Sequence, residues 1–508
     1  MQRWFKLIVV VLGGLLLSGC SARTAKQTKQ PTITIMAPYL TSNAPAKQGP
    51  VTQRLEKMTK THLNFRWYTN DSYSDKVNVA MSASQLPDII VFKEKDASFI
   101  KYAKSGEFWN LTKYLKKYPN LAKANPQVLR NSSINGQIYG IYRSRDIMRA
   151  SVTLRKDWLK KLKLKTPTTL PELENVMRAF TEDDPDGNGK DDTYGMLVNK
   201  WYGLNNGAPW EIVATWLGAP NGWGERKDGS LYPAFMSPAY LKSLKWFRQA
   251  IQKGYINPDF ATSTDSLITS FINQRGGSFI QPAYGMAELS ERLNDQQLKQ
   301  IYAFTGNLKA SASATQHSWA TSGYSGLLAI PKASVKTKAE LNRILKFLDQ
   351  ADSKQGQVLM NNGIANQNFK VDPDDRQYGT PLKPGSKRYR EITNDTIAIS
   401  QVKTGVNANN EAYRIVSKTL QPIADKRYAT MAADQKHAVN NEAAPYVSAT
   451  YSRNGAVLDK IITDAQVQYM AGEIDDQQWQ QAIDKWLDAG GRQVIREYSQ
   501  LNQQRSSE

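Results

Sequence analysis

The sequence is poor in the residues and patterns that many enzymes use. Its 508 residues include one cysteine and three histidines, so an internal disulfide is excluded and the histidines His62, His317 and His437 form no close cluster in sequence. None of the patterns H-E-x-x-H, G-x-S-x-G, G-x-x-x-x-G-K and C-x-x-C occurs. No catalytic site is therefore predicted. An exported glycosidase or polysaccharide lyase remains an alternative, because the two carboxylates of such a site are brought together only by the fold.

A hydrophobic run long enough to cross a membrane is also missing. The apolar segment 7–17 is shorter than the about 20 residues that a spanning helix needs. Two cations precede it and LSGC at 17–20 follows, which is typical of a secretory signal and resembles the bacterial lipobox. We expect residues 1–20 to be a lipoprotein signal peptide, Cys20 to carry the lipid, and residues 21–30 to be a flexible tether. The alternative is an ordinary signal peptide with an incidental cysteine.

Acidic residues are scarce relative to basic ones. Residues 1–19 hold two of the 66 basic residues and none of the 46 acidic ones, so without them the net charge falls from +20 to +18. For an exported, anchored chain this charge suits anionic lipids and cell-wall polymers, and we expect no nucleic acid partner. It also permits an acidic ligand such as a uronate-containing sugar. The alternative is a charge that serves only solubility.

The first hundred residues alternate between strand and helix patterns. Apolar and polar residues alternate at 32–38 and 62–68, and a continuous apolar run occupies 86–92, whereas 51–58 and 75–83 have helical spacing. This order favours an α/β fold with a mostly parallel sheet that is covered by helices.

The rest of the chain repeats the mixture less regularly. Strands are expected at 152–154, 277–281 and 323–331. The polar, proline-rich segment 366–392 is predicted to be a long loop or crossover. The last 120 residues are predicted to be mainly helical, since their apolar residues recur at helical spacing.

The segment 183–195, DDPDGNGKDDTYG, has the pattern of a calcium loop. Oxygen donors recur at loop positions one, three, five and nine, a glycine stands at position six, and position seven offers its carbonyl: Asp184, Asp186, Asn188, Asp192, Gly189 and Lys190. Position twelve is Gly195 in place of the glutamate of an EF-hand, so Thr193, Asp191 or water would complete the shell. The alternative is a solvated acidic turn, because Asp, Asn, Gly and Pro favour turns without a metal.

Aromatic residues are abundant, with 12 Trp and 24 Tyr. Flat aromatic rings stack on the apolar faces of pyranose sugars, while polar side chains bond the hydroxyls. For Trp210, Trp223 and Trp319, which stand among Gly, Asn and Ser, a core position and a ligand platform are equally compatible with the sequence. Tyr39 and Tyr284 follow expected strands, where α/β sheets bind ligands. These five residues are the predicted ligand-binding residues.

Six segments in a characteristic order carry a family resemblance: LSGC at 17–20, LPDII at 86–90, LRKDWL at 154–159 with TPTTLPEL at 166–173, the loop at 183–195, GYINPDF at 254–260, and the tail at 471–498. Together they resemble the family 1 extracellular solute-binding lipoproteins of Gram-positive ABC importers. The chain is similar in particular to the alginate-binding and complex-carbohydrate-binding receptors of that family.

This resemblance implies a periplasmic-binding-protein-like fold of two α/β lobes with a hinge and a ligand cleft between them. Lobe 1 is expected to comprise 31–150 plus 325–390, and lobe 2 to comprise 151–324 plus 391–508 with the calcium loop. In the family this loop binds structural calcium and often has an acidic residue at position ten. Here position ten is Thr193.

The expected function is a membrane-anchored receptor on the extracellular face, which binds an oligosaccharide and delivers it to ABC permease subunits. We expect a monomer without enzymatic activity, with calcium as a structural cofactor. A binding protein for a peptide or another non-sugar solute is the second alternative.

Overall fold

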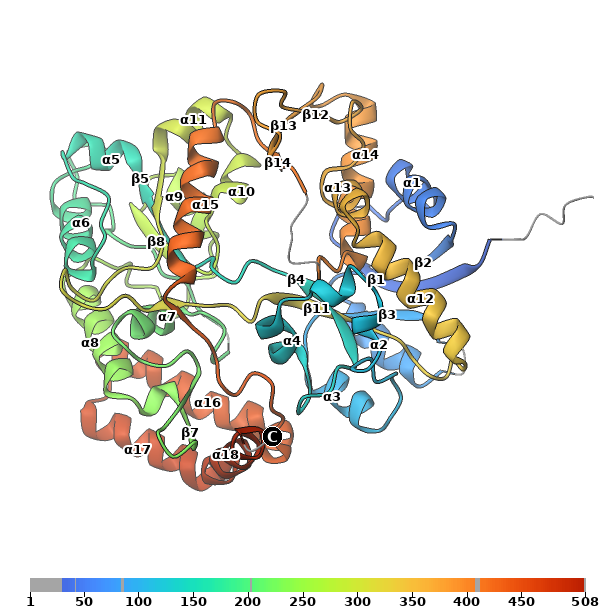
Figure 1. Cartoon of the computed structure of the whole chain (residues 1–508). Coiled ribbons are helices and arrows are strands. Elements are labelled where there is room, and N and C mark those ends of the chain that lie inside the picture. Colours follow the sequence, from blue (N-terminus) through green and yellow to red (C-terminus); the bar gives the residue numbers. More distant parts are fainter. Residues whose placement is uncertain (1–29, 42, 84–85, 202, 407–411, 507–508) are drawn as a thin grey trace, which may run out of the picture.

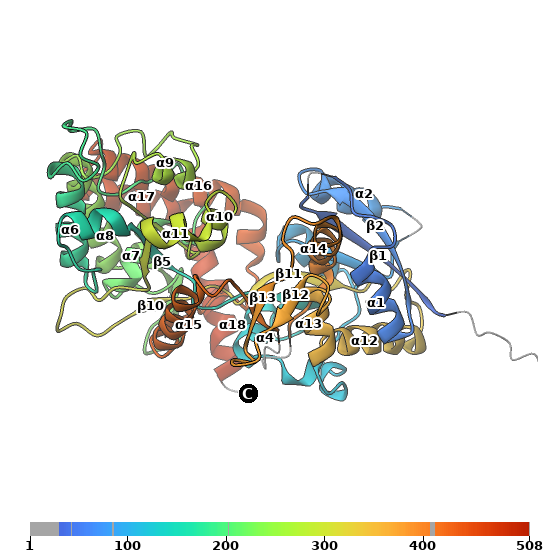
Figure 2. The same ribbon diagram turned by 90° about the horizontal axis from the view of Figure 1, so that it is seen from above.

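The computed structural model describes residues 30–41, 43–83, 86–201, 203–406 and 412–506. The chain forms two lobes that lie side by side (Figure 1). They are also separate in a view turned by 90° (Figure 2). Among these described residues, no helix has both the length and the apolar character needed to span a bilayer.

The first lobe is built on a five-stranded sheet in the order β2-β1-β3-β11-β4. Its strands are β1 (Thr32–Tyr39), β2 (His62–Thr69), β3 (Ile89–Phe92), β4 (Gly140–Ser144) and β11 (Tyr324–Ala329). β1 runs parallel to β2 and β3, which confirms the prediction of a parallel sheet for these three strands. The remainder is not parallel, because β11 inserts antiparallel between β3 and β4. All four residues of β3 are buried, as expected for a strand covered on both faces.

Helices from distant parts of the sequence cover this sheet. They are α1 (Pro50–Thr59), α2 (Tyr73–Met81), α3 (Ala97–Lys104), α4 (Pro126–Ser132), α12 (Lys338–Ala351), α13 (Lys354–Asn362) and α14 (Lys387–Ile399). The start of α1 is capped from α14, since the Asp395 carboxylate accepts the backbone N–H groups of Val51 at 2.6 Å and Thr52 at 2.9 Å. A Cβ atom on Gly49 would lie 2.1 Å from the Asp395 carboxyl carbon, so this close approach requires glycine.

The same helix corrects a predicted boundary. Residues 391–508 were expected in lobe 2, but Ile392 and Ile399 of α14, together with Val402 and Val406, are buried in the core of the first lobe. The apolar spacing of α14 gives no information about which lobe the helix packs on. The last crossing between the lobes was therefore predicted at residue 391, whereas the chain stays in the first lobe at least as far as Val406.

The segment 366–392 is also more ordered than predicted. It contains the antiparallel strands β12 (Phe369–Val371) and β13 (Tyr378–Pro381), and β14 (Arg414–Ile415) adds to β13 in parallel. These strands are only two to four residues long, which is too short for a hydrophobic alternation to be recognised.

The second lobe has a smaller, antiparallel sheet in the order β8-β5-β9. These strands are β5 (Ser151–Arg155), β8 (Ser278–Gln281) and β9 (Tyr302–Thr305), and β5 pairs antiparallel with both neighbours. The parallel pairing predicted from the first hundred residues therefore does not extend to this lobe. The second lobe also contains two two-stranded sheets: β6 (Trp223–Glu225) with β7 (Leu231–Pro233), and β10 (Ser318–Trp319) with β15 (Ala438–Val439).

Helices make up most of the second lobe: α5 (Lys156–Lys161), α6 (Leu170–Glu182), α7 (Pro209–Trp216), α8 (Pro238–Gln252), α9 (Leu267–Ile272), α10 (Met286–Ser290), α11 (Asp295–Ile301), α15 (Gln421–Gln435), α16 (Ala449–Ala471), α17 (Asp476–Trp486) and α18 (Arg492–Ser506). The predicted helical character of the C-terminal part is confirmed. Trp479, Ile483 and Trp486 of α17 are buried as one apolar face. Gly490, with a φ of 132°, lies in the turn between α17 and α18.

Candidate functional site

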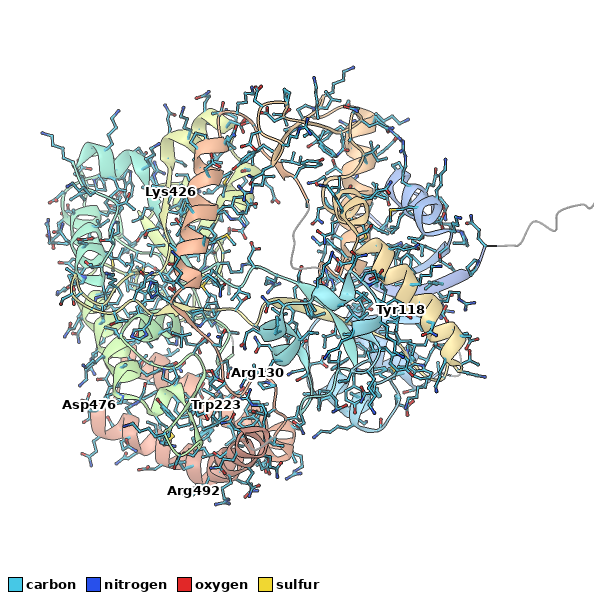
Figure 3. The ribbon with its side chains drawn as sticks, viewed as in Figure 1. Tyr118, Arg130, Trp223, Lys426, Asp476 and Arg492 are labelled. Carbon is cyan, nitrogen blue, oxygen red and sulfur yellow. The ribbon has the colours of Figure 1, made fainter. Side chains whose placement is uncertain are left out.

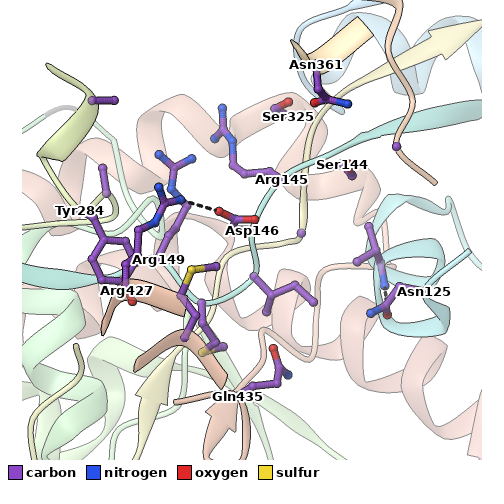
Figure 4. A pocket seen from close by; sticks show the side chains of 18 of the residues that line it. Asn125, Ser144, Arg145, Asp146, Arg149, Tyr284, Ser325, Asn361, Arg427 and Gln435 are labelled. Carbon is purple, nitrogen blue, oxygen red and sulfur yellow. Dashed lines mark hydrogen bonds and ion pairs between the residues drawn. The ribbon is translucent and has the colours of Figure 1, made fainter. Parts of the chain in front are cut away.

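A cavity of about 680 Å³ lies between the lobes, where the chain crosses from one to the other. Residues 144–149 line it from the connection between β4 and β5, and residues 283–288 from the turn after β8 in the second lobe. Further lining residues come from the end of the first-lobe core and from α15: Lys403, Gly405, Val406, Arg427, Met431, Ala432 and Gln435. Both lobes and the connections between them therefore contribute to one site (Figure 4).

The Tyr284 ring is placed on the cavity wall by a tight turn. Gly285 has a φ of 69°, and a Cβ atom there would lie 3.1 Å from the Thr153 hydroxyl oxygen. The ring centroid of Tyr284 lies 5.3 Å from the Arg427 guanidinium and 5.2 Å from the ring of Phe304. The Tyr284 hydroxyl oxygen is buried, and it has no hydrogen-bond partner among the described residues. This burial raises its pKa, so the hydroxyl stays protonated.

Basic side chains dominate the charge of the cavity. Arg145, Arg149, Lys403 and Arg427 line it, against the acidic residues Asp146 and Glu288. The Asp146 carboxylate accepts a hydrogen bond from the Arg427 guanidinium at 3.0 Å, and Figure 4 shows this ion pair between the crossing segment and α15. Arg145 and Arg149 have no ion pair or side-chain hydrogen bond to any described residue.

The protein surroundings lower the pKa of several of these cations. Burial lowers the pKa of Arg143, which precedes the lining residue Ser144, to about 10, and the neighbouring Arg145 adds to the effect. Arg149 has a lowered pKa through desolvation and through the charge of Arg145, with Arg427 a smaller contributor. Desolvation, followed by the charge of Arg143, likewise lowers the pKa of Lys403. The cavity is thus a positively charged region in which water is partly replaced by protein.

Uncharged polar side chains occupy much of the remaining wall. These residues are Asn125, Ser144, Ser325, Gln357, Asn361 and Gln435. Their amides and hydroxyls both donate and accept hydrogen bonds, which is the chemistry that recognises sugar hydroxyls.

A second cavity of about 1040 Å³ adjoins the first. The two share Asp146, Asn361 and Met431 as lining residues. Three tyrosines and two arginines line the second cavity: Tyr389, Tyr413, Tyr428, Arg376 and Arg414. The Arg414 guanidinium lies 3.7 Å from the ring centroid of Tyr428. The two cavities therefore adjoin at these shared residues, and the second adds tyrosine rings and guanidiniums next to the first.

Of the five predicted ligand-binding residues, only Tyr284 lines the first cavity. Trp210, Trp223 and Trp319 are buried in the core of the second lobe, at 4%, 6% and 6% exposure. The indole N–H of Trp210 donates to Gln466, and Trp223 packs against Tyr498 at 4.9 Å between ring centroids. For these tryptophans the core alternative is correct, because Trp210 in α7, Trp223 in β6 and Trp319 in β10 are covered by other elements of the second lobe. Tyr39 ends β1 in the first lobe and is not part of the cavity.

The arginines of the cavity were missed at the sequence level. Arg145 and Arg149 stand in a short stretch, RSRDIMR at 143–149, directly before the strand β5. The signal that could have identified them is the group of arginines next to the predicted crossing between the lobes at residue 150. Arg427 lies on α15, whose apolar residues form no clear stripe, and nothing in its neighbourhood marks it.

The loop 183–195 brings the predicted calcium ligands together. The Asp184 carboxylate accepts the backbone N–H groups of Gly187 at 2.9 Å and Gly189 at 3.2 Å. The Asn188 side-chain amide donates to Asp186 at 2.9 Å and to Asp192 at 3.1 Å. Among the described residues, no group of three or more His, Cys, Asp or Glu side chains is arranged to hold a metal ion. Hydrogen bonds thus link Asp184, Asp186 and Asp192 to Asn188 in the loop, and carboxylate and amide oxygens are the ligand types that calcium takes in proteins.

Thr193 does not complete the loop. Its hydroxyl is buried and donates to the Phe180 carbonyl oxygen at 2.8 Å, which ties the end of the loop to α6. Hydrogen bonding from Gly189 and other loop groups lowers the pKa of Asp184 against a partial desolvation, so this carboxylate stays ionised. The loop lies on the second lobe outside the cavity lining. Cys20, the predicted lipid attachment site, lies outside the described residues.

A charged, polar cavity between two hinged lobes defines a solute-binding protein. The match to the family model for the bacterial extracellular solute-binding proteins covers residues 37–358, and the chain belongs to this family. It is 36% identical to lipoprotein LipO of Bacillus subtilis, over 98% of each chain. It is 32% identical to the polygalacturonan/rhamnogalacturonan-binding protein YtcQ of the same organism, over 99% of each chain.

The fold has close solved counterparts. An HMO-binding, ABC-transporter-associated solute-binding protein from Bifidobacterium longum infantis superimposes with a TM-score of 0.69 at 18% identity, over 93% of this chain and 98% of that one. The expected two-lobed fold and family are thereby confirmed. The family consists of binding proteins.

Proposed function

We propose that this protein is a receptor that captures an oligosaccharide between its lobes and presents it to an ABC permease, without making or breaking a bond. The observation that carries the proposal is the cavity of about 680 Å³ at the crossing between the lobes. A ligand held there touches both lobes and their connections, so its binding favours the closed arrangement of the lobes. A permease that recognises this arrangement distinguishes the loaded receptor from the empty one.

The lining chemistry supports a sugar ligand. Tyr284 offers an aromatic ring and a hydroxyl without a partner among the described residues, while Asn125, Gln435 and their polar neighbours offer amides. The continuation into the second cavity, with its three tyrosines, supports a ligand of several sugar units. The relative YtcQ is named for binding polygalacturonan and rhamnogalacturonan, which supports the same ligand class.

Anchoring is part of the proposal. Cys20 in LSGC is the proposed site of lipid attachment, residues 21–30 form the tether, and the body acts as a monomer on the extracellular face of the cell membrane. The similarity to a protein named as a lipoprotein over nearly its whole length supports this arrangement.

A structural calcium ion is the proposed occupant of the loop 183–195. Asp184, Asp186, Asn188 and Asp192 would hold it with their side chains and Lys190 with its carbonyl oxygen. The loop follows α6 directly, and Asp184 has a φ of 43°, in the left-handed region. A bound divalent cation would neutralise the carboxylates gathered there and fix the chain that leaves α6.

The test is a thermal-shift screen of the purified protein against neutral and uronic oligosaccharides, each with and without a calcium chelator. A ligand that binds the folded state raises the melting temperature by mass action. Failure of every sugar to stabilise the protein would contradict the proposal, and stabilisation by peptides instead would identify a different solute. Release of shorter products from a polysaccharide would identify a glycosidase or lyase.

A further inference from the structure

The cavity between the lobes contains two arginines with an unused capacity to bind anions. Arg143, which does not line the cavity, donates to the Ser325 and Ser400 carbonyl oxygens, and Arg427 has its ion pair with Asp146. Arg145 and Arg149 have no such partners among the described residues. Each guanidinium presents several N–H donors in a plane, and this fork matches the oxygens of a carboxylate or a sulfate.

The arginines also lie unfavourably close to other cations. Arg145 and Arg427 both act on Arg149 as like charges, and desolvation by the surrounding protein is the main reason that its pKa is lowered. An arginine that serves only solubility points into bulk water, where like charges are screened. Arg149 is half-buried in the wall, and Figure 4 shows it on the same side of the cavity as Arg145 and Arg427. A bound anion would relieve this repulsion.

The acidic residues on the wall do not neutralise this group. Asp146 is engaged by Arg427, and Glu288 is exposed, with a hydrogen bond of 3.5 Å from Gln281. Glu94 favours the charged form of Arg145, and Asp146 and Glu288 favour that of Arg149. Four basic side chains nevertheless line the cavity against two acidic ones, so its wall has an excess of positive charge.

We infer that the ligand is an anionic oligosaccharide, and that Arg145 and Arg149 bind an oxyanion substituent of a sugar ring, carried as a carboxylate or as a sulfate. This inference rests on the proposed function and specifies its substrate class. Arg427 forms one edge of this anion site. Its guanidinium is ion-paired with Asp146 and lies 5.3 Å from the centre of the Tyr284 ring. The polar side chains and the tyrosines of the adjoining cavity take the uncharged parts of the sugar chain.

The experiment is calorimetric titration of the whole protein with three sets of probes. Oligogalacturonates and oligomannuronates carry carboxylates, their methyl esters keep the same rings without the charge, and carrageenan oligosaccharides carry sulfates. We expect at least one anionic set to bind about tenfold or more tightly than the methyl esters, because charge-assisted hydrogen bonds to two guanidiniums are lost in the esters. The set that binds identifies the oxyanion.

Variants assign the preference to the two arginines. Arg145→Gln and Arg149→Gln are each expected to weaken binding of the anionic probe about tenfold and to leave binding of the methyl ester within about twofold. Arg149→Lys keeps the charge and should restore part of the affinity. Arg492→Gln, at an exposed site on α18 that does not line the cavity (Figure 3), removes the same charge and should have no effect. Melting curves of all variants verify that they are folded. Arg145→Gln is the variant least able to disturb packing, because the Arg145 side chain is exposed.

The outcomes separate the two proposals. Equal affinity for uronates and their methyl esters, or unchanged affinity in both glutamine variants, would overturn the anionic ligand and leave the oligosaccharide receptor standing. Binding of no probe, charged or neutral, would overturn the receptor function and the inference with it.

Discussion

The Asp146 carboxylate and the Arg427 guanidinium are 3.0 Å apart, and they join the segment that crosses between the lobes to helix α15. The pair is partly exposed, with side-chain exposures of 46% for Asp146 and 30% for Arg427, so its contribution to stability is small. The pair should affect ligand binding more than stability, because it lies on the cavity wall and Asp146 places a negative charge close to the proposed anion site.

Asp146→Asn is expected to strengthen binding of an anionic oligosaccharide by about two- to fivefold. The reason is that one like charge is removed from the site and Arg427 is released from its partner. Binding of a methyl-esterified probe should not change. Titration calorimetry at low and high salt measures both, and the gain should shrink at high salt. Asp464→Asn, on the exposed face of α16, is the matched control, and an equal gain there would mean that only net charge matters.

Two aromatic substitutions distinguish the ligand site from the core. Tyr284→Phe removes a hydroxyl without a protein partner among the described residues, so we expect a three- to tenfold loss of sugar affinity, by the usual magnitude of about one hydrogen bond, with little change in stability. Trp210→Phe removes the donor to Gln466 and leaves a void, so it should lower the free energy of unfolding by about 1–3 kcal/mol and leave affinity unchanged. Urea unfolding and titration on the same samples give both numbers, and the reverse pattern would restore Trp210 as a ligand platform.

The calcium proposal predicts an effect on stability that is separable from binding. Asp186→Ala should lower the melting temperature in calcium buffer by about 3–6 °C, because the ion no longer favours the folded state. Affinity for sugar at low temperature should change less, since the loop lies outside the cavity lining. Asp191→Ala, in the same loop but not a proposed ligand, is the control. If chelator does not alter the melting temperature of the unmodified protein, the loop is a solvated acidic turn.

A pH-dependent contribution is predicted at the start of α16. The Glu497 carboxylate accepts hydrogen bonds from the Ser448 hydroxyl and from the Thr450 N–H and hydroxyl, and these outweigh its desolvation and lower its pKa from 4.5 to about 2. A lowered pKa stabilises the fold above pH 4.5, and the contribution is lost as the pH falls toward 2.

Glu497→Gln should therefore lower the free energy of unfolding by about 1–2 kcal/mol at neutral pH. The difference from the unmodified protein should close as the pH falls toward 2. Glu473→Gln, exposed between α16 and α17, provides the comparison, and a gap that persists in acid would point to lost packing instead of lost charge.

The sequence was informative where a local pattern decides the structure. The alternation in β1 and β2 and the buried run of β3 predicted the parallel half of the first sheet, and the spacing of Trp479, Ile483 and Trp486 predicted the packed face of α17. The calcium loop at 183–195 stays a prediction, which the sequence allows because the ligand spacing of such a loop is fixed along the chain. In each case the physical constraint acts within about ten residues.

The parts that could not be predicted depend on contacts between distant segments. β11 pairs with β3 and β4 across more than 180 residues, and α14 packs on the first lobe through Asp395 and α1. The anion site combines Arg145 and Arg149 with Arg427, nearly 280 residues away, and no spacing rule connects them. The tryptophans were ambiguous for the same reason, since their burial depends on which distant elements pack over α7, β6 and β10.

The position of β11 between β3 and β4 has a consequence for how the protein folds during synthesis. A ribosome makes the chain from its N-terminus, and β4 has no neighbour in the described sheet until residues 324–329 have been made. The cap on α1 arrives later still, with Asp395. The core of the first lobe therefore cannot be completed while only the N-terminal third of the chain has been made. Its last contacts, from Asp395, become available when about four fifths of the chain has been synthesised. A chain whose core closes late in synthesis suits the export proposed for this protein, because a secretion channel accepts unfolded chains.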